Sequence, residues 1–305
     1  MSSKYSGQSD RECFNETISL LLGRSSCRDF LDKQIPSDML QLVLNAGLHA
    51  PTAGNLQPYS IIKIENTDTK RKLAEMCKQN FIANAAVLLL FCIDLHRNER
   101  WANLEAAPYT ATSSFRHFWV SFQDTMICAQ SICTAADSMG LGSVYIGTVI
   151  DMPVDIQTMF GLPKGVFPVV LLCLGYPRIR HASRKKLGVN TIVHSERYRE
   201  MEDKELLDAF NKKYESEKLP VSKERLETIL KVCRAAHGEE FADKCASRIR
   251  ADGYINRAQH YFGLHYRADL MPDGNDKYLK IMEDFGFNWF KEYHAFSGVP
   301  KKRGK

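Results

Sequence analysis

The sequence predicts a mixed domain of helices and short strands, followed by a smaller extension built only of helices. Helical and strand-like patterns alternate along roughly the first two-thirds of the 305-residue chain, without a repeat or a low-complexity segment. A polar connection that ends in proline, Glu215–Pro220, is the best candidate domain boundary. Beyond it, apolar spacing predicts helices alone. We therefore divide the chain into a domain of residues 1–214 and an extension of residues 215–305.

Apolar residues at helical spacing predict the first two helices. The first contains Phe14 and Leu22 and ends at Gly23, a residue type that suits a helix C terminus. The second begins after Ser37, whose side-chain oxygen is expected to cap its free amides. Pro51 ends this second helix, because proline cannot continue the hydrogen-bond ladder.

Four short runs rich in apolar residues are expected to be strands: Ser60–Ile64, Val87–Ile93, Ser143–Ile150 and Phe167–Leu174. The second run is continuously apolar, which indicates a strand buried on both faces. A short helix that ends at Gly161 precedes the last strand. A long helix over residues 113–139 is apolar around much of its circumference, so it is expected in the core or at a subunit interface.

The extension is expected to contain three helices, at about residues 223–236, 239–261 and 277–295. Cys233 and His237 lie four residues apart on the first of them, but no third and fourth ligand is evident nearby. We therefore expect no metal site. The final residues 301–305 are strongly basic and are expected to form a disordered tail.

Composition argues for an ordinary globular protein of the cytoplasm. Hydrophobic residues make up 44% and charged residues 25%, and the net charge of +5 is scattered, so nucleic-acid binding is not expected. The start of the chain lacks a secretory apolar run, and the longest apolar stretches are too short to cross a bilayer. Nine cysteines without a C-x-x-C pair indicate reduced thiols.

Four separated segments carry residues suited to binding a phosphorylated, planar ligand. Arg24–Phe30 supplies two arginines and two serines, and Ala50–Pro58 combines proline, glycine and asparagine between a helix and a strand. Gly140–Gly147 contains glycines that permit close backbone approach. The strand end Leu174–Pro177 is followed by the basic cluster Arg184–Lys186. Each segment alone is common in solvated loops and turns.

Together and in this order, the segments resemble the nitroreductase family of FMN-dependent enzymes. The matching patterns are R-x-S-x-R, A-P-S-x-x-N-x-Q-P, G-L-G-S-x-x-I-G and L-G-x-P, then a basic pair. The resemblance covers roughly residues 12–214. It is closest to the NADPH-linked flavin reductase and major oxygen-insensitive nitroreductase subgroup, because of Tyr145–Gly147 and of Val193-His194 before a short acidic helix.

The resemblance assigns the flavin phosphate to Arg24, Ser25 and Ser26, with Arg184 and Lys186 as a second phosphate-binding pair. Two departures from the family pattern concern these residues. Ser25 stands where the subgroup often has a second basic residue. Arg184 and Lys186 reverse the usual Lys-x-Arg order, which keeps the charge but not the two-pronged hydrogen-bond geometry.

The resemblance places the remaining candidates around the flavin ring. Arg28 matches a cation near the pyrimidine edge, where reduced flavin is negatively charged, and Gln79 matches a glutamine that bonds the same edge. Gly147 and Thr148 match backbone that donates a hydrogen bond to N5. The strand that leads to them adds Tyr145 and Ile146. The loop expected to reach the partner subunit's flavin contains Pro51, Thr52, Ala53, where a serine is usual, and Asn55.

By resemblance, the fold is α+β: a nitroreductase-like α/β/α sandwich that forms an interlocked homodimer, here with a helical C-terminal extension. The implied reaction is ping-pong, in which NADPH or NADH reduces FMN and leaves before a nitroaromatic, quinone or flavin acceptor takes the electrons. No catalytic side chain is required, because the flavin carries the chemistry.

Two other functions, and two roles of the extension, stay open at this point. The chain could be an FMN-binding protein with little turnover, or a relative that removes halogens reductively or fragments flavin. The extension is rich in aromatic residues between Tyr254 and Phe290. These either dock its helices on the core or cover the flavin mouth and narrow the choice of substrate.

Overall fold

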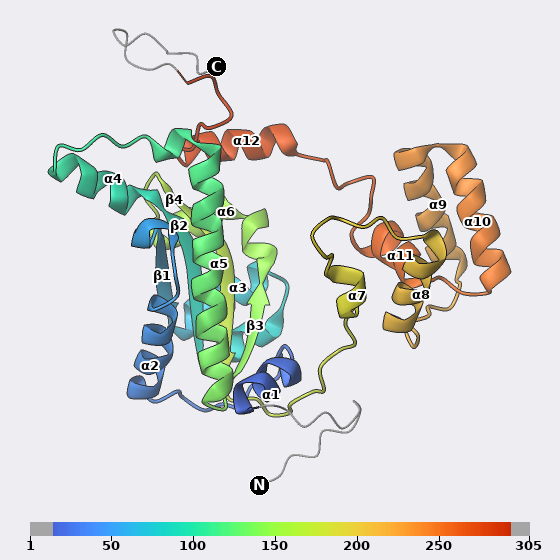
Figure 1. Cartoon of the computed structure of the whole chain (residues 1–305), viewed down its shortest axis with the longest axis horizontal. Helices are drawn as coiled ribbons and strands as arrows, with labels where there is room; N and C mark the ends of the chain where they lie inside the picture. Colours follow the sequence, from blue (N-terminus) through green and yellow to red (C-terminus); the bar gives the residue numbers. More distant parts are fainter. Residues whose placement is uncertain (1–14, 294–305) are drawn as a thin grey trace. The chain divides into compact units, whose positions relative to one another are not determined.

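The computed structural model describes residues 15–293, which form two compact units (Figure 1). One unit comprises the residues up to 183 together with those from 277 onward, and the other comprises residues 184–276. These limits differ from the expected division at residue 214, which stays a prediction about functional domains. Phe14, residues 294–295 of the last expected helix and the basic tail 301–305 lie outside the described residues.

The first unit is built around one antiparallel sheet. Its strands are β1 (Tyr59–Ile64), β2 (Val87–Asp94), β3 (Gly142–Ile146) and β4 (Val166–Gly175), in the order β1-β2-β4-β3. Every residue of the two central strands is buried, so the expectation of a doubly buried β2 is confirmed. The sheet is antiparallel and still buried on both faces, because helices cover both.

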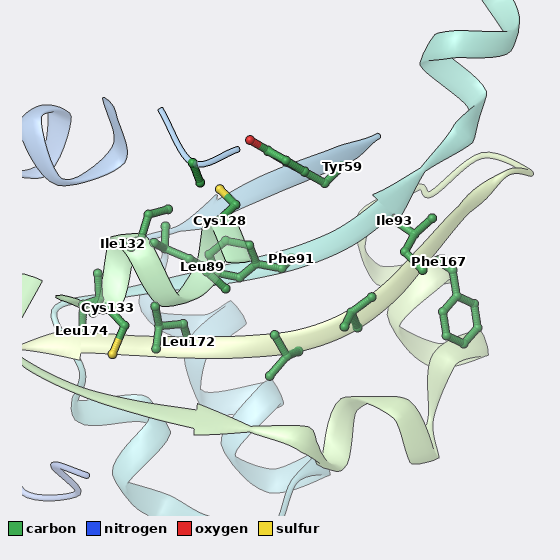
Figure 2. Close-up of a cluster of buried hydrophobic side chains, with 14 of the residues drawn as sticks. Tyr59, Leu89, Phe91, Ile93, Cys128, Ile132, Cys133, Phe167, Leu172 and Leu174 are labelled. Atoms are coloured by element: carbon green, nitrogen blue, oxygen red, sulfur yellow. The ribbon is translucent and has the colours of Figure 1, made fainter. Parts of the chain in front are cut away.

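Alternation along β2 divides the core into two layers. Leu89 and Phe91 belong to one hydrophobic cluster, with α2 (Ser37–Leu48), α5 (Phe115–Ser138) and the residues around α12 (Asn275–Asp284). Leu88 and Leu90 point to the opposite cluster, with α3 (Thr67–Met76) and α6 (Pro153–Phe160). Figure 2 shows the first cluster, in which Leu89 and Phe91 lie beneath α5. The sandwich of helices on both faces of a sheet is therefore confirmed.

Two boundaries differ from the sequence-based predictions. Ser37 is the first residue of α2 and makes no capping bond, since Pro36 occupies the cap position. The strand expected to reach residue 150 ends at Ile146, because its pairing with β4 stops there and the chain turns into a 3-10 helix, Gly147–Asp151. The short helices α1 (Glu16–Gly23) and α6 end where Gly23 and Gly161 predicted.

The helix α5 packs across β2 and β4 and also contacts α2, so it is central to the first unit (Figure 1). Its buried side is not purely apolar, because Asp124 and Asp137 are buried together with small residues and Ile132. Conversely, Phe115 and Trp119, which contribute to its apolar pattern, stay largely exposed. One remaining helix of this unit, α4 (Leu95–Leu104), follows β2 directly.

The second unit is helical, as predicted for most of it. Its elements are α7 (Val189–Ile192), α8 (Asp203–Lys213), α9 (Lys223–His237), α10 (Glu239–Asp252), α11 (Arg257–His260) and a π-helical turn (Tyr261–His265). The helices α9 and α10 pack on a small hydrophobic cluster of their own. The prediction of a single helix over residues 239–261 was wrong, because Gly253 adopts a left-handed conformation and ends α10.

The last expected helix ends at Asp284 and not near residue 295. The residues that follow it, Phe285 and Phe287, are fully buried in the cluster between α5 and the sheet. For this part of the extension, docking on the core is therefore confirmed, whereas the covering of the flavin mouth stays a prediction. No helix of residues 15–293 is long and apolar enough to cross a membrane.

The helices α2 and α5 approach so closely at Gly47 that one added methyl group there tests their packing. A Cβ at Gly47 would overlap Ile132 Cγ1 and lie 2.7 Å from Cδ1. We expect Gly47→Ala to lower the free energy of unfolding by about 1–3 kcal/mol, despite its better helix propensity. The exposed neighbour Asn45→Ala should change it by less than about 0.5 kcal/mol. Chemical denaturation would measure both; an unchanged or more stable Gly47→Ala protein would contradict the close packing.

Candidate cofactor-binding site

The first candidate segment, residues 24–28, lies against the start of β3. The Cys27 amide donates to the Ser143 carbonyl at 2.9 Å. A side chain at Gly142 would be excluded, because its Cβ would lie 2.7 Å from Cys27 Cβ. Gly142 therefore allows the arginine- and serine-rich segment to approach the strand that ends in the other candidate residues.

Arg24 is tied into the protein on its inner side. Its Nε lies 3.4 Å from Asp137 Oδ2 and 3.2 Å from Cys133 Sγ, and its Nη2 donates to Ser143 Oγ at 3.3 Å. The Asp137 side chain is only 5% exposed, against 23% for Arg24. Burial raises the pKa of Asp137, while the positive charges of Arg24 and Arg180 act to lower it. Arg24 is thus paired with a buried carboxylate and remains partly exposed to solvent.

The other residues of this segment have different surroundings. The Ser25 hydroxyl donates to the His181 carbonyl at 2.7 Å. The Ser26 side chain is half-buried and makes no hydrogen bond within residues 15–293. Arg28 is exposed, with its guanidinium carbon 6.0 Å from the centre of the Phe81 ring. This distance is at the outer limit of a cation–π contact, so Arg28 keeps a charge that a ligand can reach.

Gln79 and Thr148 meet, as expected of two residues around one ligand. Gln79 Nε2 donates to Thr148 Oγ1 at 3.3 Å. Gln79 also immediately precedes the 3-10 helix Asn80–Asn84 that carries Phe81, so the contact partner of Arg28 comes from the same segment. Gly147 is exposed, and a Cβ added there would meet no atom within 4 Å. The backbone at Gly147 therefore faces open space beside the Gln79–Thr148 pair.

The strand that leads to this point contributes two different side chains. Ile146 is buried in the core beneath the sheet, so only its backbone can face a ligand. Tyr145 is half-buried, and its hydroxyl donates to Gln130 Oε1 on α5 at 3.4 Å. Burial raises the pKa of Tyr145, so the phenol stays protonated at neutral pH.

The loop that contains Pro51, Thr52, Ala53 and Asn55 is held by α5. The Ala53 amide donates to both carboxylate oxygens of Asp124, at 3.1 and 3.3 Å. The loop includes a 3-10 helix, Ala53–Asn55, in which Gly54 and Asn55 have φ of 59° and 54°. Pro51, Ala53 and Asn55 are exposed, and Thr52 Oγ1 accepts from the Gln57 amide at 3.3 Å. This exposed, fixed loop is thus available to a second molecule.

Asp124 and Asp137 are thirteen residues apart on the same helix, about 20 Å along its axis. The loop at residues 51–55 and the Arg24 segment are anchored at these two separate points. In one chain, they are therefore not gathered around one ligand. Arg184 and Lys186 belong to the second unit, where both are exposed, and their part in the site stays a prediction.

Sequence reasoning missed the buried partners Asp124, Cys133, Asp137 and Ser143. A signal was present: Cys133 and Asp137 lie four residues apart, and so on one side, in the second half of a helix expected to be central. An acidic residue in such a helix calls for a positive or amide partner, because a buried unpaired carboxylate is costly. The sequence alone does not say which partner it has.

The residues present fit an FMN molecule. Arginines and hydroxyls suited to a phosphate lie beside the start of β3, and an amide, a hydroxyl and open backbone lie at its end. No group of three or more His, Cys, Asp or Glu in residues 15–293 could hold a metal ion. Charge and hydrogen-bond donors are what a flavin nucleotide needs.

The chain belongs to the Nitroreductase family, whose model matches residues 21–176. It is 30% identical to an NADPH-flavin oxidoreductase of Vibrio harveyi over 188 residues, 61% of this chain and 76% of that protein. It is also 30% identical to an oxygen-insensitive NADPH nitroreductase of Salmonella typhimurium over 189 residues, 62% of this chain and 77% of the relative.

Solved structures agree on the fold. Nitroreductase A from Vibrio parahaemolyticus superposes with a TM-score of 0.62 at 28% identity, covering 67% of this chain and 86% of its own. The hypothetical oxidoreductase YcnD from Bacillus subtilis reaches 0.69 at 26% identity and covers 90% of this chain and 98% of its own. The second match extends well beyond the residues that the family model covers.

The anchoring of the 51–55 loop can be tested through Asp124. Asp124→Ala removes both acceptors of the Ala53 amide, so we expect faster hydrogen exchange at Ala53 and a loss of about 1–3 kcal/mol in stability. Hydrogen exchange followed by NMR or mass spectrometry measures the first, and denaturation the second. Asp68→Ala, at an exposed carboxylate of α3, is the matched control. Unchanged exchange at Ala53 in Asp124→Ala would show that the loop is held by other contacts.

Proposed function

We propose that the chain is an FMN-dependent oxidoreductase that passes electrons from NADPH or NADH to nitroaromatic, quinone or flavin acceptors. The observation that carries this proposal is the meeting of Gln79 with Thr148 beside the open backbone of Gly147, next to the arginine segment. Family membership and relatives named as FMN reductase and NADPH nitroreductase support it. We propose a ping-pong cycle, in which the nicotinamide leaves before the acceptor binds, as the family resemblance implies.

Bound FMN supplies the electron-carrying chemistry, and the chain supplies position and charge. Arg24, Ser25 and Ser26 would hold the phosphate. Around the ring the chain uses different groups, each directed at one edge: Arg28 and Gln79 at the pyrimidine, and Gly147 with Thr148 at N5. A cation at the pyrimidine edge favours the negatively charged reduced ring. The attraction between the two charges is stronger beside the bound ring than in solution, because less water screens them.

The active enzyme is a homodimer in which the 51–55 loop of one subunit reaches the flavin of the other. Exposed apolar side chains on α1 and α5 support this assembly. The helix α1 has no buried residue although it carries Ile18, Leu21 and Leu22, and Trp119 of α5 is also exposed. Clustered exposed apolar side chains mark interaction surfaces, and symmetric pairs are the commonest oligomers.

The cysteines of the described residues are free thiols, most of them buried. Free thiols persist in reducing compartments, which supports a cytoplasmic location for this enzyme.

The first test is a visible spectrum of the purified protein, followed by anaerobic addition of NADPH and, separately, of NADH. We expect a flavin spectrum that bleaches with one or both donors and returns when a nitroaromatic or quinone is added. Product analysis would identify two-electron reduction of the acceptor. A flavin spectrum that neither nicotinamide bleaches would contradict the reductase function, and a protein that cannot be loaded with FMN would contradict the site.

The dimer is tested at Leu22, which is 62% exposed. In a monomer, Leu22→Asp at a solvent-facing position should change stability by less than about 0.5 kcal/mol. At an interface it buries an unpaired carboxylate, so we expect a shift from dimer to monomer in sedimentation velocity. Lys72→Asp, at an exposed polar position of α3, is the control and should leave the dimer intact. A wild-type monomer at micromolar concentration would exclude the proposed assembly.

A further inference from the structure

The last turn of α5 contains a buried charge that the proposed reaction does not use directly. Asp137 is 5% exposed, and its Oδ2 lies 3.4 Å from Arg24 Nε. The same oxygen lies 4.0 Å from the fully buried Cys133 thiol, which in turn is 3.1 Å from Ser143 Oγ. A buried carboxylate costs several kcal/mol unless it is paired and hydrogen-bonded, so this cluster is an expensive feature to retain.

The cluster fixes the plane of the Arg24 guanidinium. Nε is engaged by Asp137 and Cys133, and Nη2 donates to Ser143 Oγ at 3.3 Å. Because the guanidinium is rigid and planar, fixing Nε and Nη2 also fixes the direction of Nη1. Arg24 is partly exposed while its carboxylate partner is not, so the fixed group has one accessible side.

We propose that Asp137 is a positioning residue, which acts through Arg24 to hold the guanidinium ready for the phosphate of FMN, with Ser143 fixing the second nitrogen. This inference rests on the proposed function, since it needs FMN as the ligand. A flexible arginine would have to be ordered when the phosphate binds, whereas here its rotamer is already set. Arg24 keeps its positive charge for the ligand, because a guanidinium stays protonated in proteins.

A merely structural role would look different. If Asp137 only joined the end of α5 to β3, its loss would weaken the protein without regard to the phosphate. FMN and riboflavin differ only in that phosphate, so the ratio of their dissociation constants separates the two roles. We call this ratio the phosphate preference.

The experiment measures the phosphate preference of the flavin-free full-length protein by quenching of flavin fluorescence. We expect Asp137→Asn to weaken FMN binding about tenfold and to change riboflavin binding by less than about twofold. In an Arg24→Ala background, Asp137→Asn should have no further effect on FMN, because the group through which it acts is gone. The control is Asp94→Asn, which alters an equally buried carboxylate at the start of α4. It should leave the phosphate preference unchanged.

Equal losses for FMN and riboflavin, an unchanged preference, or full additivity with Arg24→Ala would overturn the positioning role. If Asp137→Asn does not fold, Ser143→Ala removes the Nη2 contact and the neighbouring Cys133 contact but leaves Asp137 in place. It should reduce the preference about threefold, and no reduction would again overturn the role. A wild-type protein that binds neither flavin would reject the proposed function itself. A wild-type protein that prefers FMN, beside an Asp137→Asn protein that prefers it equally, would reject only this inference.

Discussion

The packing of α5 across the two central strands is the constraint on which the other features depend. Small and medium residues of α5, such as Ala129, Cys133 and Ala136, are fully buried, which allows the helix to approach the sheet closely. Gly47 extends the same close approach to α2. Because α5 is fixed against the sheet over most of its length, groups on it can serve as reference points for segments that have no regular structure of their own.

Two such groups are the buried carboxylates. Asp124 holds the 51–55 loop through a backbone amide, and Asp137 holds Arg24 through its guanidinium. Burial raises the pKa of both carboxylates, which is a cost in stability that the Ala53 amide and the Arg24 charge only partly offset. A buried apolar residue would be cheaper at either position. The cost is intelligible if each carboxylate fixes a segment whose exact placement matters for binding.

Sequence reasoning predicted the elements better than their limits. The strands β2 and β4 could be predicted, because a continuous apolar run indicates a buried strand. The end of β3 at Ile146 depends on where β4 offers a partner, and the break at Gly253 depends on a left-handed turn that apolar spacing does not encode. The site followed the same rule. The motif residues could be recognised in the sequence. Asp124 could not be paired with Ala53, because the two lie 71 positions apart and a single sequence does not show which distant residues are in contact.

The identity of the first motif arginine follows from this arrangement. A lysine at residue 24 would retain the charge, but its single nitrogen could not contact Asp137 and Ser143 with the separate nitrogens that Arg24 uses and still offer a third. Arginine contacts the interior with Nε and Nη2, and under the proposed function Nη1 is left for the phosphate. Since FMN carries the reaction, the protein contributes by placing charge before the ligand arrives. In this chain, Asp137, a buried residue at the end of α5, sets the position of that charge.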